Sequence, residues 1–113
     1  MAKQLTFTDP LNGETYTLEF TRKTVEQMER SGFVSSELAS KPMLHLPRLF
    51  AGAFLAHHRF VRTDVIDDLY SRMRNKDDLL SKLIEMYNEP LETLMAEPEE
   101  EDESKNMEWS ANW

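Results

Sequence analysis

Residues 16–33 read YTLEFTRKTVEQMERSGF, and within this stretch the chain changes from one kind of secondary structure to another. The first part alternates apolar and polar residues and places Tyr16, Leu18 and Phe20 on one face, as in a half-buried strand. Thr21 then offers a side-chain oxygen that can cap a helix, and apolar residues follow at helical spacing. We therefore predict a strand that leads directly into a helix.

The helix that follows Thr21 is expected to end at about Ser31. Val25 and Met28 fall on its inward face, and charged residues spaced four apart occupy the solvent side. Gly32 can adopt the left-handed conformation that ends many helices, and an apolar residue just beyond it commonly packs back on the last turn. The glycine therefore predicts the boundary of the helix.

Upstream of this stretch, a second apolar alternation predicts a partner strand. QLTF at residues 4–7 alternates in the same way, and TDPLNGE at residues 8–14 contains Asp-Pro and Asn-Gly, which are typical of turns. Together these residues predict a β-hairpin with one apolar face. Because two strands alone are marginally stable, that face is expected to pack on helices.

Three further helical patterns follow downstream. The first is predicted to begin near Met43–Leu46, with Pro47 in its first turn, and to run to about His58. Small residues at 51–53 would let another helix approach closely. The inward stripe of this helix is predicted to contain Leu46, Leu49, Phe50, Ala53, Phe54 and His57.

Polar caps mark the next helices. Thr63 is predicted to cap a third helix, and Asn75 with Asp78 resembles a capping box for a fourth. Pro90 is expected to open a short fifth helical turn. The inward residues of these segments are predicted to be Val65, Ile66, Leu69, Met73, Leu79, Leu80, Leu83, Ile84, Tyr87, Leu91, Leu94 and Met95.

These segments predict an α+β, mainly helical fold. An N-terminal β-hairpin is expected to pack on a small bundle of four to five helices, with residues 1–96 forming one domain. Beyond Pro98 charged residues replace the apolar pattern. Residues 97–113 are therefore predicted to form a disordered acidic tail that ends in a tryptophan-containing peptide.

The distribution of charge excludes several function classes. The formal net charge is −8, and residues 97–108 hold seven acidic residues and one lysine. The body is therefore nearly balanced, and no basic footprint for nucleic acid is present. No apolar run reaches the roughly 18 residues that span a membrane. Cysteine is absent, which fits a reducing cytoplasm.

The sequence contains few residues in patterns that support catalysis. His57 and His58 are adjacent, so on a helix they point about 100° apart and cannot bind one ion as residues four apart can. Glycine-rich phosphate loops and a distinctive pair of carboxylates are also lacking. We therefore expect no metal, no cofactor and no enzymatic activity. A metal site would have required one of these histidines together with Asp64, Asp67 or Asp68.

Four blocks of the sequence resemble, in order, the small tail assembly chaperones of long-tailed (siphovirus-type) bacteriophages and prophages of Gram-positive bacteria. The blocks cover almost the whole chain. They are YTLEFTRKTVEQMERSGF, KPMLHLPRLFAGAFLAHHRFV, LIEMYNEPLETLM and, after the acidic run, MEWSANW.

The resemblance implies a protein that binds other proteins and carries no established catalytic residues. Such chaperones are expected to bind the helical tape measure protein and keep it soluble until tail tube subunits polymerise around it. A longer product, made by ribosomal frameshifting, is expected to recruit the tail tube protein. The resemblance also implies action in the host cytoplasm and absence from the mature virion.

A chaperone for a helical client needs an apolar groove between helices. The residues that we predict to line such a groove are large and apolar, although each of them could instead be buried core. They are Leu49, Phe50, Phe54, Phe60, Met73 and Met86.

Two tryptophans in the acidic tail are further candidates for partner binding. Trp109 and Trp113 are four residues apart and would share one face if the segment became helical on binding. The tail could dock on a partner, or it could cover a groove on the same molecule or on a neighbour. Docking on a neighbour would make the chain a homo-oligomer.

Two other functions fit the composition. The chain could be a small acidic phage regulator that binds a host protein, or a minor structural component of the tail. The genes beside it would distinguish these alternatives, because a chaperone is expected between a tube gene and a tape measure gene.

Overall fold

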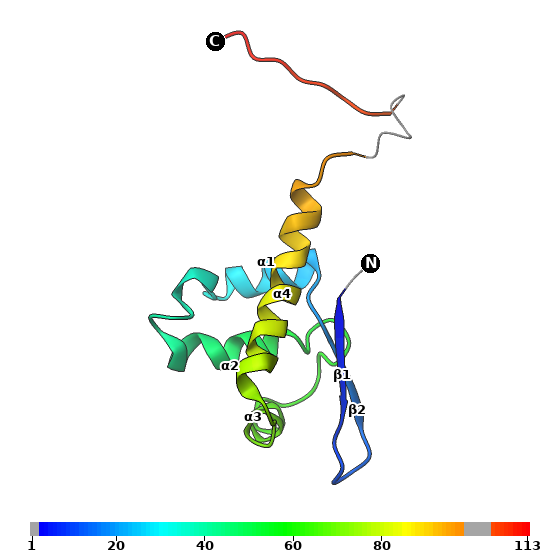
Figure 1. The fold of residues 1–113 in the computed structure, drawn as a ribbon, viewed down its shortest axis with the longest axis vertical. Coiled ribbons are helices and arrows are strands. Elements are labelled where there is room, and N and C mark those ends of the chain that lie inside the picture. The colour runs from blue at the N-terminus through cyan, green and yellow to red at the C-terminus, as the bar shows by residue number, and fades with distance from the viewer. Residues whose placement is uncertain (1–2, 99–104) are drawn as a thin grey trace.

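The computed structural model describes residues 3–98 and 105–113 and confirms the predicted α+β, mainly helical class. An antiparallel hairpin comes first and four α-helices follow within the described residues (Figure 1). The predicted flexibility of residues 99–104 lies outside the described residues. The elements are β1 Gln4–Thr8, β2 Thr15–Glu19, α1 Arg22–Arg30, the 3-10 turn η1 Ser35–Glu37, α2 Pro42–Gly52, α3 Thr63–Ser71 and α4 Lys76–Met95.

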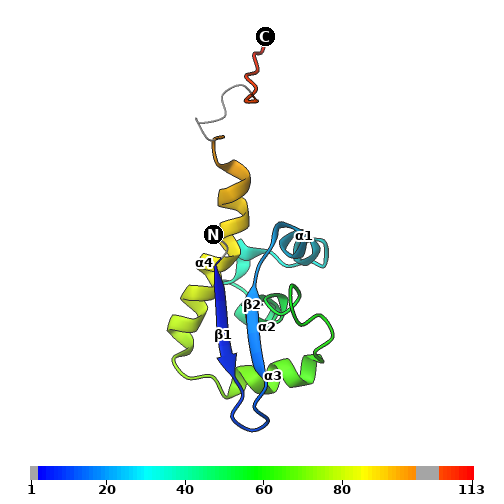
Figure 2. The same cartoon turned by 90° about the vertical axis from the view of Figure 1, so that its right-hand side faces the viewer.

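The hairpin places its aromatic face against the helices. In the antiparallel register Phe7 lies opposite Tyr16, and their rings stack with centroids 5.2 Å apart. The Phe54 ring meets both of them, at 6.4 Å and 5.7 Å between centroids. The two strands therefore do not stand alone, and Figure 2 shows them side by side along one flank of the helices.

The predicted signals at both ends of α1 are confirmed. The Thr21 hydroxyl oxygen accepts a hydrogen bond from the Thr24 backbone N–H at 3.1 Å, and the Thr24 hydroxyl oxygen accepts one from the Thr21 N–H at 2.9 Å. Gly32 has φ +102°, and the Phe33 N–H donates to the Met28 carbonyl at 3.0 Å. This is the Schellman type of helix ending.

Helix α2 is shorter at its C-terminal end than predicted. It spans Pro42–Gly52, and turns replace the helix that we expected to continue to His58. The Ala53 carbonyl accepts a hydrogen bond from the Glu19 N–H at 3.1 Å, and the His58 Nε2 atom accepts one from the Thr17 N–H at 2.9 Å. Residues 53–58 therefore supply acceptors for backbone N–H groups at the free edge of β2. These tertiary hydrogen bonds outweigh the local helical pattern.

Two predictions about α4 are wrong. Asn75 precedes the helix with φ 55° and makes no side-chain capping bond, so the capping box with Asp78 is absent. Pro90 does not open a separate turn, because α4 continues through it to Met95. A proline removes one backbone donor, and the packing of its buried ring helps the helix to continue.

Helix α3 differs from the prediction in smaller ways. Arg62 rather than Thr63 occupies the capping position, and it makes no side-chain capping bond. Ile66 and Leu69 are buried as predicted, whereas Val65 is exposed.

One apolar core joins the hairpin to the helices. The close approach predicted for residues 51–53 is confirmed, because a Cβ atom added at Gly52 would overlap the Sδ and Cε atoms of Met28. The buried apolar residues are Tyr16, Leu18, Phe20, Met28, Phe33, Leu49, Phe50, Ala53, Phe54, Ile66, Leu69, Leu83, Met86 and Tyr87.

Polar contacts hold both ends of β1 to the helical part. The Lys3 N–H donates to a Glu89 carboxylate oxygen of α4 at 2.9 Å. At the other end, Arg72 at the end of α3 donates to the carboxylate of Asp9 at 2.8 and 2.9 Å. The first strand is thereby fixed to two helices that come much later in the chain.

Candidate functional site

Most of the predicted groove residues lie in the core. Leu49, Phe50 and Phe54 are buried, so the expectation that they line an accessible groove is wrong for this structure, whereas Met86 is largely buried but borders a hollow beside Leu5 and Glu85. Their faces are covered by the hairpin and by neighbouring helices, since a chain of this size needs its largest apolar residues for the core. Met73 is partly buried against the same core.

The remaining three predicted residues are on the surface. Phe60, in the connection between α2 and α3, has 93% of its surface exposed. Trp109 and Trp113 are 85% and 100% exposed. Large aromatic side chains that remain in water are candidates for contacts with another protein.

The second half of α4 carries an exposed apolar cluster, although its residues were predicted to face inward. Leu91 and Leu94 are 60% and 53% exposed, and Met95 is also exposed. Figure 1 shows why, because the end of α4 extends beyond the hairpin and the other helices. No other described element covers this end of the helix, so its apolar side chains stay accessible.

A groove lies between this part of α4 and helix α1. Its volume is about 320 Å³. Val25 of α1 and Tyr87, Pro90, Leu91 and Leu94 of α4 supply its apolar lining. Charged and polar side chains complete the lining, namely Arg22, Glu26, Glu29, Ser35 and Asn88. We call this feature the α1–α4 groove.

The electrostatics of the α1–α4 groove favour a neutral, apolar ligand face. Burial, and after it the negative charge of Glu29, raises the pKa of the Tyr87 phenol, so Tyr87 stays uncharged. The apolar lining with charges around it matches the way an amphipathic helix is usually bound, with its apolar face inward. The apolar part of the groove is thus bordered by charged side chains of both signs.

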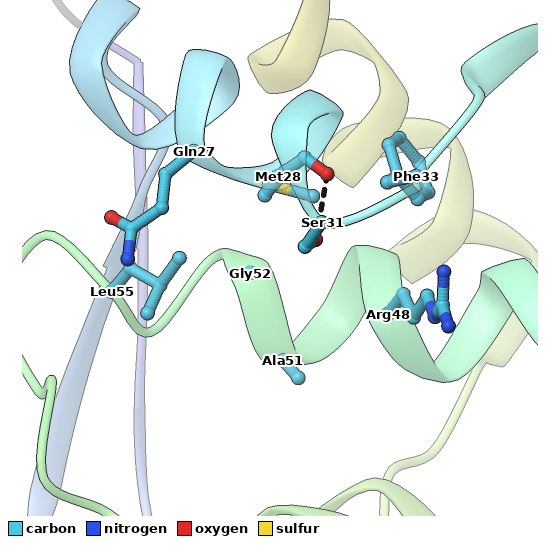
Figure 3. A pocket seen from close by; sticks show the side chains of 8 residues that line it. All are labelled: Gln27, Met28, Ser31, Phe33, Arg48, Ala51, Gly52 and Leu55. Carbon is cyan, nitrogen blue, oxygen red and sulfur yellow. Dashed lines mark hydrogen bonds between the residues drawn. The ribbon is translucent and has the colours of Figure 1, made fainter.

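A second surface runs along the other side of α1, towards α2 and the connection after it. Figure 3 shows part of it, a pocket of about 370 Å³ in which the Gln27 side chain of α1 lies beside Leu55. Two neighbouring hollows continue this pocket through Gln27, Leu55, Lys23 and Arg59. We call the combined surface the basic trough, because cationic side chains border it.

The three histidines have separate structural partners. The His45 ring is buried, and its Nε2 atom lies 3.1 Å from a Glu37 carboxylate oxygen. His57 lies 2.6 Å from Glu19, and His58 accepts the Thr17 N–H. Within the described part of the chain, no group of three or more His, Asp or Glu side chains is placed to hold a metal ion.

Two carboxylates beside these histidines have lowered pKa values. Burial alone would raise the pKa of Glu19, but hydrogen bonds from His57 and Gln4 outweigh burial and lower it. The hydrogen bond from His45, followed by the charge of Lys41, lowers the pKa of Glu37. Both glutamates are therefore ionised partners of histidine rather than poised proton donors.

The fold and its surfaces define a small α+β protein with an aromatic core, the α1–α4 groove and the basic trough. Over residues 1–113 the chain matches a family described as a domain of unknown function (DUF5055), and it belongs to that family. Comparison with curated proteins and with solved structures finds no match. Among the described helices, none is long and apolar enough to cross a membrane.

Proposed function

We propose that this chain is a phage tail assembly chaperone, a non-enzymatic protein that binds the helical tape measure protein and keeps it soluble before the tail tube polymerises. The proposal combines the sequence resemblance with one structural observation. That observation is the exposed apolar cluster at the end of α4, which is continuous with the α1–α4 groove.

The α1–α4 groove provides a physical basis for binding such a client. An amphipathic helix of the client would place its apolar face against Leu91, Leu94 and the lining around Pro90. Each large apolar side chain that becomes fully buried contributes about 1.5–3 kcal/mol. Several such side chains compensate for the cost of association and cover the client surface that would otherwise aggregate.

The client-binding step is tested by co-expression with the tape measure protein of the same genome. Wild-type chain is expected to move the client into the soluble fraction and to co-purify with it. The Leu91→Ser/Leu94→Ser variant should lose both effects without a lower melting temperature, since both side chains are largely exposed. Leu11→Ser is the matched control, because Leu11 is 78% exposed but lies in the hairpin turn.

Two results would contradict the proposal. If the client is equally insoluble with and without the wild-type chain, chaperoning is wrong. If the Leu91→Ser/Leu94→Ser variant solubilises the client as well as the Leu11→Ser control does, the α1–α4 groove is not the binding site.

The proposal places the chain in the host cytoplasm, outside the finished virion, with the tail tube protein recruited by a longer product. Mass spectrometry of purified virions separates this function from a minor structural component, because a chaperone should be absent from them. Affinity capture from infected cells separates it from a regulator. The tape measure protein, rather than a host protein, should be the main captured partner.

A further inference from the structure

Cationic side chains predominate among the charged residues that line the basic trough. Lys23, Arg30, Arg48 and Arg59 border it. Glu26 is the acidic residue in its lining, and it forms an ion pair with Arg30 on the next turn of α1. The cationic side chains therefore outnumber the carboxylate on a protein whose net charge is −8.

The trough also offers apolar surface between these charges. Met28, Ala51 and Leu55 line one part of it, and Figure 3 shows Met28 between α1 and α2 and Leu55 beyond the end of α2. At the other end Phe60 projects into solvent beside Lys23 and Arg59. A ligand that fits this surface has negative charge and large apolar side chains close together.

The chain itself contains a segment with this chemistry. Residues 107–113, MEWSANW, contain Trp109 and Trp113, both exposed, and Glu108. Six acidic residues precede them within positions 97–103. We call residues 107–113 the tryptophan segment.

The position of the tryptophan segment favours a second copy of the chain as the acceptor. In both views residues 105–113 lie beyond the far end of α4, away from α1 and α2 (Figures 1 and 2). Helix α4 is 20 residues long and directs the chain away from its own trough. The trough of the same molecule is left open, and the segment is presented outward.

We infer that the tryptophan segment of one copy docks in the basic trough of another. Trp109 and Trp113 cover the apolar surface formed by Leu55 and Phe60, and Glu108 of the same segment pairs with Lys23 or Arg59. Lys23, Leu55 and Arg59 do not line the α1–α4 groove, so this docking does not require the proposed client.

A mixing experiment tests docking between copies. The Trp109→Ser/Trp113→Ser variant keeps the trough but lacks the two tryptophans that dock in it. The Lys23→Glu/Arg59→Glu variant keeps both tryptophans but reverses the charge of two residues that border the trough. Each full-length variant should sediment as a monomer at a concentration where wild type associates. An equimolar mixture should form a one-to-one pair, because each variant supplies what the other lacks.

The charge change itself needs a control. Arg74→Glu/Lys82→Glu alters the net charge equally at exposed positions remote from the trough, and this variant should associate as wild type does. Raising the salt concentration from about 50 mM to 500 mM should weaken wild-type association, since exposed charges are then screened.

Tryptophan fluorescence gives an independent measurement, since Trp109 and Trp113 are the two tryptophans of the chain. The emission maximum of wild type should shift to shorter wavelength as concentration rises, and that of Lys23→Glu/Arg59→Glu should not. A shifted maximum that is independent of concentration would show docking within one molecule and overturn the inference. Failure of the two variants to pair would also overturn it. These measurements use the chain alone, so they leave the test of client binding unaffected.

Discussion

Asp9 and Arg72 form a two-pronged ion pair between the hairpin turn and the end of α3. Arg72 Nη1 donates to Asp9 Oδ1 at 2.8 Å, and Nη2 donates to Oδ2 at 2.9 Å. Asp9 Oδ1 also accepts the Leu11 N–H at 3.0 Å. These hydrogen bonds, with Arg72 the larger cause, lower the pKa of Asp9 from 3.8 to about 2.

The lowered pKa predicts a pH-dependent contribution of Asp9 to stability. Because the pKa is lower in the folded state, the contribution is complete above about pH 4 and is lost as pH falls towards 2. Asp9→Asn should therefore lower the melting temperature at pH 7 and differ progressively less from wild type below pH 4. Thermal melts across this range measure the effect. A difference that stays constant down to pH 2 would contradict the assignment.

Two phenylalanines in neighbouring segments should respond differently to the same substitution. Phe54→Ala removes a ring buried against Phe7, Tyr16 and Phe50, and it should cost about 3–5 kcal/mol of unfolding free energy. Phe60→Ala should change stability by less than about 0.5 kcal/mol, because the ring is in solvent. Urea denaturation measures both. If both variants lost the same unfolding free energy, Phe60 would also have to lie in the core.

The cap of α1 can be tested against a threonine that does not cap. Thr21→Ala removes one acceptor of the capping box and should cost about 1 kcal/mol. Thr63→Ala changes the first residue of α3, where the structure has no side-chain capping bond, and should be close to neutral. Chemical denaturation of the two variants compares them directly. A larger loss for Thr63→Ala would reverse the assignment of caps.

His58 is predicted to protect the edge of β2 through a specific acceptor atom. His58→Leu leaves the Thr17 N–H without its partner and should cost about 1–3 kcal/mol. His58→Gln retains an acceptor and should lose less. Hydrogen exchange at the Thr17 amide provides the local measurement. Unchanged protection of that amide in His58→Leu would show that the bond is unimportant.

The sequence was sufficient to predict those elements whose ends are determined by hydrogen bonds between residues close together in the chain. Thr21 and Gly32 were predicted to bound α1, and both do so through contacts within a few residues. The hairpin was predictable for the same reason, since its turn and its alternation lie close together in sequence. The class of the fold follows from these elements and from the helical patterns after them.

The predictions that were wrong concern segments whose structure is determined by contacts with residues far away in the sequence. The helical pattern of residues 53–58 gives no sign that their acceptors will pair with β2. Pro90 was predicted to separate two helical segments, but α4 continues through it, and the C-terminal end of this helix carries Leu91 and Leu94. The α1–α4 groove was therefore missed, although apolar residues on both sides of a proline were visible in the sequence.

The attachments of Lys3 to Glu89 and of Arg72 to Asp9 determine when the fold can close. The partners are 86 and 63 residues apart. A ribosome makes β1 first, yet it must release α4 as far as Glu89 before both attachments can form. The two ends of β1 are thus synthesised early and attached late, and during this interval of translation the first strand is most exposed to misassembly.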